Sequence, residues 1–170
     1  PAYAEPADPA AGRTTATRAA KVASSPSAAD RGAWHRMGDL GHLDDEGRLW
    51  FEGRATHRVE TPDGMLASVP TELLFEGHPE VARVALVGLG ARGAQRPVLV
   101  AEPRAGRVPN AADRARIRAE LLELGRSRGA DRGPARRIDE VLFHPEFPTD
   151  VRHQAKIRRE DLARWAETRA

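Results

Sequence analysis

The sequence predicts a small α+β domain. Short β-branched runs joined by turns containing Gly and Pro alternate with stretches of helical periodicity. The chain has 170 residues, of which 40% are apolar and 31% charged, which suits one globular domain or one domain with a piece of another. Residues 1–30 are mainly Ala, Pro, Ser and Thr with almost no large apolar side chains, so we expect them to be poorly ordered.

Two hairpins are predicted first. Strands at 34–43 and 48–53 flank a turn that ends in Gly. Strands at 57–60 and 65–69 flank the turn at 61–64, in which Pro presets φ and Gly accepts positive φ.

A short helix and a pair of long strands follow. We expect the helix to open at Pro70 and to end near residues 77–79. Its inward-facing residues are Leu73, Leu74 and Phe75. The β-branched runs at 81–89 and 97–101 predict two antiparallel strands joined by a Gly-rich loop.

The last third of the chain predicts two helices around a third strand. Asn110 is a good N-cap for a helix that runs to about Leu124 and is ended by Gly125 and Gly129. Its expected buried residues are Ile117, Leu121, Leu122 and Leu124.

A strand at 138–143, a loop at 145–149 and a final helix at 158–168 complete the chain. Leu162 and Trp165 form the apolar side of that helix. We find no internal repeat, and the whole pattern predicts antiparallel hairpins and a three-stranded sheet with flanking helices in a small antiparallel α+β domain.

Composition excludes several classes of function. The chain has no Cys, so it has neither a disulfide framework nor a thiol nucleophile. Its longest apolar run, residues 84–89, is too short for a transmembrane segment, and residues 1–30 lack a signal-peptide core. We therefore expect a soluble, cytoplasmic protein.

The high isoelectric point is not a sign of nucleic-acid binding. Of the 27 basic residues, 25 are Arg and only Lys21 and Lys156 are Lys, which explains a pI of about 9.7 at a net charge of +2. Acidic residues are interleaved with the arginines and only 5% of residues are aromatic, so we expect no nucleic-acid partner.

One Gly-rich motif and the histidines are better explained structurally. Gly88, Gly90 and Gly93 match a dinucleotide-binding pattern after a strand, but a Pro and a second strand follow at once and leave no room for the helix that this chemistry needs. A hairpin loop is therefore predicted. The six His residues show no paired spacing typical of metal ligands, so no metal site is predicted.

Three short stretches contain residue types suited to phosphate and carboxylate chemistry. Asp39 and Arg54 each follow a Gly, and Lys156 lies near the C-terminus. Each of them taken alone is more often a turn or solvent-exposed residue. Their order and separation are more informative than any one of them.

Over about residues 30–166, this order resembles the C-terminal part of the adenylate-forming superfamily. That superfamily includes acyl-CoA synthetases, luciferases and the adenylation domains of peptide synthetases. Residues 34–43 resemble its aromatic-x-x-Thr-Gly-Asp-x-Gly-x-Leu stretch, with Met37 in place of Thr. The further matching stretches are its Asp-x-x-Gly turn at 44–47, the Gly-Arg approach to its hinge at 51–54, and the helix end before its Val-rich strand at 78–81.

Two stretches narrow the resemblance. Residues 147–157 lack the Ser-Gly or Thr-Gly that usually precedes the Lys in acyl-CoA synthetases. Together with residues 54–61, they resemble the branch that forms β-lactones from long-chain 2-alkyl-3-hydroxy acids in bacterial olefin biosynthesis. In that branch a Pro-x-Asp-x-Arg-His-x-Ala-Lys-Ile-x-Arg-Glu run closes the chain.

The resemblance implies roles for four residues. Asp39 would accept hydrogen bonds from both ribose hydroxyls of ATP, and Arg54 would bind ribose or phosphate. The catalytic residue would be Lys156, bridging the substrate carboxylate and the nucleotide, because cations must be in place where the carboxylate meets the α-phosphate. Thr56 matches the hinge position, where the family more often has Asp or Lys.

The implied second step is attack of the substrate's own β-hydroxyl on the acyl-adenylate, which releases AMP and closes a four-membered ring. His57, Arg58 and His153 lie on segments that could face this step. For a histidine, however, a solvated or structural role is the commoner one.

The resemblance also implies a division into domains. Residues 1–55 would be the end of the large N-terminal AMP-binding domain, and residues 56–170 the mobile C-terminal α+β domain. The family's phosphate loop and its adenine- and acyl-binding segments do not occur in the sequence, so we expect a fragment of a longer enzyme that is inactive alone. ATP and Mg²⁺ would be bound mainly by the N-terminal domain.

Three functions are therefore compared. The first is a ligase that activates a fatty acid and forms a β-lactone. The resemblance leaves open whether this ligase forms a complex with other enzymes of the olefin pathway. A fatty acyl-CoA ligase that forms a CoA thioester is the second, and CoA dependence would distinguish it. The third is a non-catalytic binding or docking module, against which stands the joint occurrence of Asp39, Arg54 and Lys156.

Overall fold

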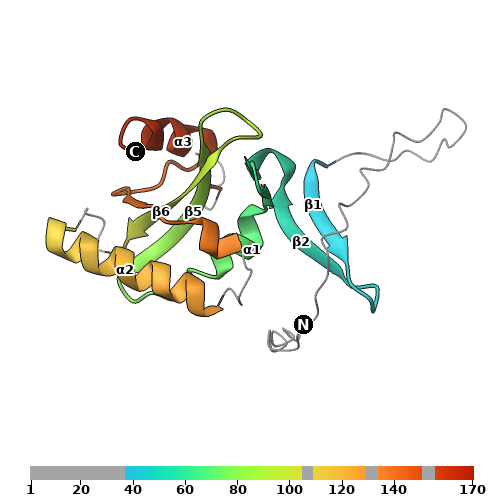
Figure 1. Ribbon diagram of the computed structural model, residues 1–170, viewed down its shortest axis with the longest axis horizontal. Helices are drawn as coiled ribbons and strands as arrows, with labels where there is room; N and C mark the ends of the chain where they lie inside the picture. Colours follow the sequence, from blue (N-terminus) through green and yellow to red (C-terminus); the bar gives the residue numbers. More distant parts are fainter. Residues whose placement is uncertain (1–36, 105–108, 129–133, 151–155) are drawn as a thin grey trace, which may run out of the picture. The chain divides into compact units, whose positions relative to one another are not determined.

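The computed structural model describes residues 37–104, 109–128, 134–150 and 156–170 (Figure 1). These residues belong to one compact unit. The beginning of the first predicted strand, residues 34–36, lies outside the described residues. No helix within the described ranges has the length and apolar character that a bilayer crossing requires.

The first predicted hairpin is confirmed. Strand β1 (Asp39–Leu43) pairs with β2 (Leu49–Arg54) in antiparallel register. The Asp44 carboxylate organises the turn, because it accepts hydrogen bonds from Trp50 Nε1 at 2.7 Å and from Arg48 Nε at 2.7 Å. These two donors hold the pKa of Asp44 well below its usual range.

The second hairpin is confirmed but is shorter than predicted. A 3₁₀ turn, η1 (Ala55–His57), leads to β3 (Val59–Thr61) and β4 (Gly64–Leu66), which are antiparallel. The Thr61 hydroxyl donates to the Gly64 carbonyl at 2.7 Å, and Gly64 has a φ of +119°, so the turn needs a glycine there.

Helix α1 (Ser68–Leu73) begins two residues earlier than predicted. Pro70 therefore lies within its first turn, where a missing N–H is tolerated. Phe75 is fully buried, but the prediction that Leu73 faces inward is wrong, since Leu73 is 55% exposed. Successive helical residues are rotated by about 100°, and because Thr71 and Glu72 face the core, Leu73 points outward.

The central sheet is mixed. The antiparallel pairing of β5 (Val81–Leu89) with β6 (Arg96–Pro103) is confirmed. The Gly-rich motif begins in β5 with Gly88 and continues into the loop at 90–95, without a helix. However, β7 (Val141–Phe143) pairs parallel to β6. The expectation of a purely antiparallel domain is therefore wrong, because the helical connection between β6 and β7 returns the chain to the same end of the sheet.

Helices α2 (Ala111–Arg128) and α3 (Arg159–Glu167) cover opposite faces of the sheet (Figure 1). On the α2 face the core includes Phe75, Leu86, Leu99, Ile117 and Leu121. On the α3 face it includes Val87, Val100, Phe147, Leu162 and Ala166. The strands between the two helices are buried on both sides, which explains their almost continuous apolar sequence.

The predicted start of α2 is confirmed and its predicted end is wrong. The Asp113 N–H donates to Asn110 Oδ1 at 2.9 Å, as expected for an N-cap. The helix then continues through Gly125 to Arg128. Gly129, the second predicted helix end, lies outside the described residues. A Cβ at Gly125 would lie 2.4 Å from Cε1 of Phe75, so this glycine gives the Phe75 ring room to pack and does not end the helix.

The last segment follows the prediction closely. A short 3₁₀ helix, η2 (Pro134–Arg137), precedes β7, which begins at Val141 and not at Ile138. Residues 144–150 form a loop, and α3 carries Leu162 on its buried side with Trp165 half-buried. The α+β fold with a three-stranded sheet and flanking helices is thus confirmed, with a mixed sheet.

Candidate functional site

Asp39 and Arg54 meet at the open end of the first hairpin. They lie opposite each other in the register of β1 and β2, and Arg54 Nη1 lies 3.0 Å from Asp39 Oδ1. The same Nη1 donates to the Met37 carbonyl at 2.6 Å, and the Ala55 N–H donates to the Gly38 carbonyl at 2.8 Å. Strand pairing thus positions the Arg54 guanidinium beside Asp39.

Close packing of β2 on α1 depends on Gly53. Its φ is +114°, and a Cβ there would lie 2.5 Å from Ser68 Oγ. The Gly that precedes Arg54 is therefore needed both for its backbone conformation and for the approach of α1. Gly53 therefore allows α1 to pack next to Arg54, the last residue of β2.

The backbone of Lys156 is held by a short antiparallel connection. Thr149 and Ile157 form an isolated bridge, and the Asp150 N–H donates to the Lys156 carbonyl at 2.9 Å. The Arg158 N–H donates to the Pro148 carbonyl at 2.8 Å. The Lys156 side chain is exposed, so its ammonium is available to a ligand.

A buried ion pair, Glu72 with Arg159, anchors this connection to the domain; we refer to it as the anchor pair. Arg159 Nη1 and Nη2 lie 2.5 and 2.9 Å from the two Glu72 carboxylate oxygens. The Leu86 N–H donates to Glu72 Oε1 at 2.7 Å, and Arg159 Nη1 donates to the Leu86 carbonyl at 3.3 Å. The start of α3, three residues after Lys156, is therefore tied to α1 and β5.

Burial of the anchor pair has an electrostatic cost. The two side chains are only 12% and 14% exposed. Burial raises the pKa of the Glu72 carboxyl, although Arg159 and the Leu86 N–H act in the opposite direction. The pair thus keeps a charged carboxylate in an environment that favours the neutral acid.

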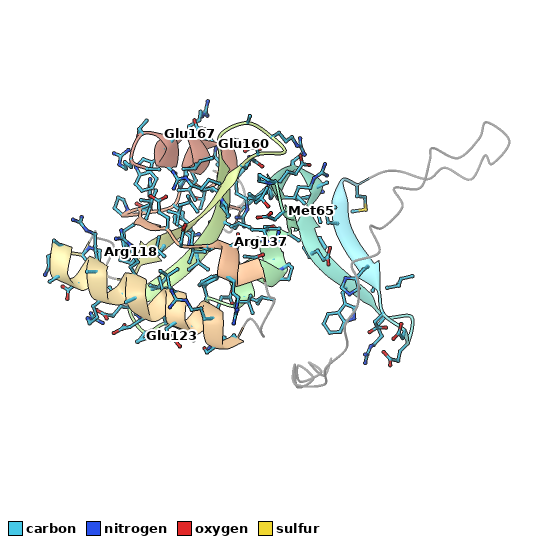
Figure 2. The ribbon with its side chains drawn as sticks, viewed as in Figure 1. Met65, Arg118, Glu123, Arg137, Glu160 and Glu167 are labelled. Atoms are coloured by element: carbon cyan, nitrogen blue, oxygen red, sulfur yellow. The ribbon has the colours of Figure 1, made fainter. Side chains whose placement is uncertain are left out.

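The predicted site residues converge on one cavity of about 370 Å³, which we call the site pocket. Arg54, Thr56, His57 and Lys156 all line it, and Asp39 is joined to it through its ion pair with Arg54. The remaining lining residues are Met37, Gly38, Asp150, Ile157, Arg158 and Glu160. Figure 2 shows Glu160 at the start of α3.

The electrostatics of the site pocket favour a neutral His57. Burial lowers the pKa of His57, and the nearby cations Arg159, Arg54 and Lys156 lower it further, while Glu160 opposes them. An unprotonated imidazole beside two exposed cations can accept a proton while those cations hold an anionic ligand.

Two predicted residues are not found at the site pocket. Arg58 does not line it, and its Nε lies 2.6 Å from Glu60 Oε1, which also pairs with Arg92. His153 lies outside the described residues. Their roles in the second step stay predictions.

Sequence reasoning missed the anchor pair. Glu72 and Arg159 are 87 positions apart, and no local pattern links them. The only sequence signal is the proximity of Arg159 to Lys156.

The described residues offer no ligand set for Mg²⁺. No three His, Asp or Glu side chains within the described ranges are grouped as metal ligands. Since magnesium prefers several oxygen ligands, this part of the chain does not fit the ion on its own, and we derive no step through it.

Comparison with known proteins finds relatives that match most of the chain. The chain is 46% identical over 154 residues to the olefin beta-lactone synthetase of Xanthomonas campestris and equally to that of Stenotrophomonas maltophilia, which covers 91% of this chain. It spans only 27% and 26% of the lengths of these two relatives. No profile of a known protein family matches the chain.

The fold has relatives among solved structures. The anthranilate CoA ligase AuaEII, solved in complex with anthranoyl-AMP, superposes with a TM-score of 0.61 at 22% identity. The match covers 81% of this chain and 25% of that one. The chain therefore has the fold of the corresponding part of this ligase, and its sequence matches the olefin beta-lactone synthetases over most of its length.

Proposed function

We propose that this chain, which matches the C-terminal part of adenylate-forming enzymes in sequence and fold, belongs to an ATP-dependent ligase that activates a 2-alkyl-3-hydroxy fatty acid and closes it to a β-lactone. The observation that carries the proposal is the convergence of Arg54, His57 and Lys156 on the site pocket, with Asp39 held beside Arg54. The similarity to two olefin beta-lactone synthetases supports the choice of product.

In the first step a carboxylate oxygen of the fatty acid attacks the α-phosphorus of ATP, and pyrophosphate leaves. Lys156 supplies an exposed ammonium that offsets the charge gathered between carboxylate and phosphate. Asp39 Oδ1 forms an ion pair with Arg54, and its second carboxylate oxygen accepts hydrogen bonds from the ribose hydroxyls. Arg54 thereby orients Asp39 and adds a second cation to the nucleotide side of the pocket.

In the second step the β-hydroxyl oxygen of the substrate attacks the acyl carbonyl, and the bond from that carbon to the AMP oxygen breaks. The hydroxyl proton goes to His57, whose lowered pKa leaves it unprotonated at neutral pH. No covalent bond to the enzyme is needed. Lys156 stays beside the leaving phosphate of AMP.

The first hairpin supports the proposed domain division. Five large apolar side chains in this hairpin or just before it are exposed, namely Met37, Leu43, Leu49, Trp50 and Phe51. Such a group of exposed apolar residues marks a contact surface. We propose that residues up to 55 pack on the large nucleotide-binding domain, and that Thr56 in η1 lies at the hinge between that domain and residues 56–170.

A chimeric enzyme tests the proposed function. The matched 154 residues of this chain replace those of the Xanthomonas campestris relative, and the chimera is incubated with ATP, magnesium and a 2-alkyl-3-hydroxy fatty acid, with and without CoA. We expect AMP and β-lactone in equal amounts without CoA. A product that forms only with CoA, as a thioester, would instead assign the chain to the acyl-CoA ligases.

Two variants of the chimera separate the two steps. Lys156→Ala is expected to lower the rate of acyl-AMP formation by about 100-fold or more, the usual effect of losing one group that stabilises transition-state charge. His57→Gln is expected to leave acyl-AMP formation intact and to slow lactone release by about 100-fold. Arg126→Ala, which changes an exposed residue paired with Glu123 on α2, is the matched control and should leave both steps unchanged. Unchanged activity in Lys156→Ala would instead favour a non-catalytic docking module.

Further proposals concern the ligands, location and partners of the whole enzyme. We propose ATP and a fatty acid as its ligands, with Mg²⁺ bound mainly by the large N-terminal domain. A cytoplasmic location and an association with other enzymes of the olefin pathway also stay predictions.

A further inference from the structure

A second cavity of about 550 Å³ lies at the β7 edge of the sheet, and we call it the edge pocket. It is bounded by α2, by the end of β7 and by the C-terminal end of α3, and none of its lining residues also lines the site pocket. Its charged and ring-bearing lining residues include Arg114, Arg118, His144, Trp165 and Arg169. Neither the proposed adenylation step nor the proposed lactone-forming step uses this pocket.

The edge pocket collects positive charge without a balancing carboxylate. Three of its lining residues are arginines, and no Asp or Glu lines it. Elsewhere on α2, Arg116 contacts the carboxylates of Glu80, Asp113 and Glu120. Within the described ranges, by contrast, Arg114, Arg118 and Arg169 form no ion pair.

Two of the three guanidinium groups are held in place before any ligand binds. Arg118 Nε and Nη2 both donate to the Val141 carbonyl, at 3.3 and 3.1 Å, and Figure 2 shows Arg118 on α2. The Arg169 guanidinium lies 4.7 Å from the centroid of the Trp165 ring, and its Nη1 donates to Thr168 Oγ1 at 2.8 Å. Because these side chains are already ordered, a ligand would lose little affinity to their immobilisation.

The aromatic wall of the edge pocket adds a further donor. The His144 and Trp165 rings meet edge to face with centroids 4.6 Å apart. His144 Nδ1 accepts the Glu146 N–H at 3.2 Å, so the neutral ring carries its proton on Nε2. Burial lowers the pKa of His144 and the charge of Arg169 lowers it further, whereas the Glu146 N–H and the carboxylates of Glu102 and Glu146 act in the opposite direction.

We infer that the edge pocket is a binding site for a small phosphate-bearing anion, either inorganic phosphate or a phosphate monoester. Three convergent guanidinium groups suit a dianion with three terminal oxygens better than a single carboxylate, because the planar guanidinium donors match phosphate geometry. A concave cavity with an aromatic wall suits a small molecule better than an extended acidic surface.

Titration of the 170-residue chain tests this inference. Inorganic phosphate and phenyl phosphate are added separately at low ionic strength, and binding is followed by calorimetry and by the fluorescence of Trp165 in a Trp34→Phe, Trp50→Phe background. We expect saturable binding of at least one probe at one site per chain. Preference for inorganic phosphate identifies the free ion as the ligand, and preference for phenyl phosphate identifies an ester.

Substitution of Arg114 is the decisive variant. Arg114 is exposed and its side chain has no hydrogen bond or ion pair within the described residues, so its removal should leave the thermal midpoint unchanged. Arg114→Ala should weaken binding by about tenfold, as expected for one charge-assisted contact, and Arg114→Glu should abolish it. Arg126→Ala is the control and should bind as the parent chain does.

Three results would overturn the inference. They are the absence of saturable binding by either probe, binding that Arg114→Glu leaves unchanged, and tighter binding of a tetraglutamate peptide than of either phosphate. The last result would assign the edge pocket to an acidic segment of another protein.

Discussion

Loss of Arg159 from the anchor pair is predicted to destabilise the domain strongly and to disturb the site pocket. Arg159→Met removes the only ion-pair partner that the described residues give to the Glu72 carboxylate, and Met replaces only the apolar stem of the Arg side chain. Glu72 is 12% exposed, so its charge would be left without compensation in a desolvated place. Breaking a buried pair from one side costs about 3–5 kcal/mol, and we expect about 3 kcal/mol because the Leu86 N–H still donates to Glu72.

The effect of Arg159→Met should depend on pH in a defined direction. Burial raises the pKa of Glu72, and removal of the guanidinium raises it further. The folded variant therefore takes up a proton at a higher pH than the unfolded chain, in which the Glu pKa is about 4.3. Stability lost at neutral pH should be recovered progressively as the pH falls towards that value.

Urea unfolding of the 170-residue chain measures both effects, with two controls. Glu72→Gln in the Arg159→Met background keeps the acceptor for Leu86 but removes the buried charge, so it should restore most of the stability. Arg164→Ala removes an exposed ion pair with Asp161 and should change the free energy of unfolding by less than about 1 kcal/mol. A free energy of unfolding of Arg159→Met within about 0.5 kcal/mol of the parent, the scatter of ordinary surface substitutions, would contradict the predicted role of the anchor pair.

Two further predictions concern acid stability and core packing. Burial lowers the pKa values of His57 and His144 below 6.5, so the unfolded chain binds protons before the folded chain does. The free energy of unfolding should therefore fall as the pH drops below about 6.5, and urea midpoints measured from pH 7 downward should show this slope. An unchanged slope in a His57→Gln, His144→Gln variant would contradict this assignment. Gly125→Ala places a Cβ 2.4 Å from Cε1 of the buried Phe75 and should lower the free energy of unfolding by about 1–3 kcal/mol despite a gain in helix propensity of about 1 kcal/mol. A thermal midpoint equal to or above that of the parent would show that the ring moves aside freely.

Features that depend on neighbouring residues were predictable from the sequence. Asn110 caps α2 as expected because an N-cap needs only the next three residues. The turn at 61–64 follows from Pro and Gly in adjacent positions. The Gly-rich motif at 88–93 was identified as a hairpin loop because the sequence that follows it leaves no room for a helix.

Features that depend on distant residues were not predictable. Gly125 has the sequence character of a helix end, and only the packing of Phe75, 50 positions earlier, explains why the helix continues. The parallel pairing of β7 depends on the path of the chain through α2. The position of Leu73 on the outer side of α1 follows from a helix start that the strand-like run before it concealed.

The sequence predicted the residues that line or adjoin the site pocket, but it did not predict the ion pair that anchors the neighbouring helix. Asp39, Arg54 and Lys156 were selected by their order and by resemblance to a family, and strand register accounts for the contact between the first two. The pair of Glu72 and Arg159, which ties the start of α3 three residues after Lys156 to α1, has no counterpart in local sequence. A positioning residue of this kind is found only once the fold brings its partner to it.

The sequence also does not show which arginines have a carboxylate partner in the fold. With 25 arginines interleaved among 25 acidic residues, the sequence cannot distinguish an arginine that neutralises a neighbour from one that is left over. The fold makes that distinction: on α2, Arg116 lies among carboxylates, whereas Arg114 and Arg118, two positions to either side, turn to a cavity that has none. The inferred anion site therefore depends on arginines that line a concave surface without a counter-charge. The net charge of the chain does not reveal it.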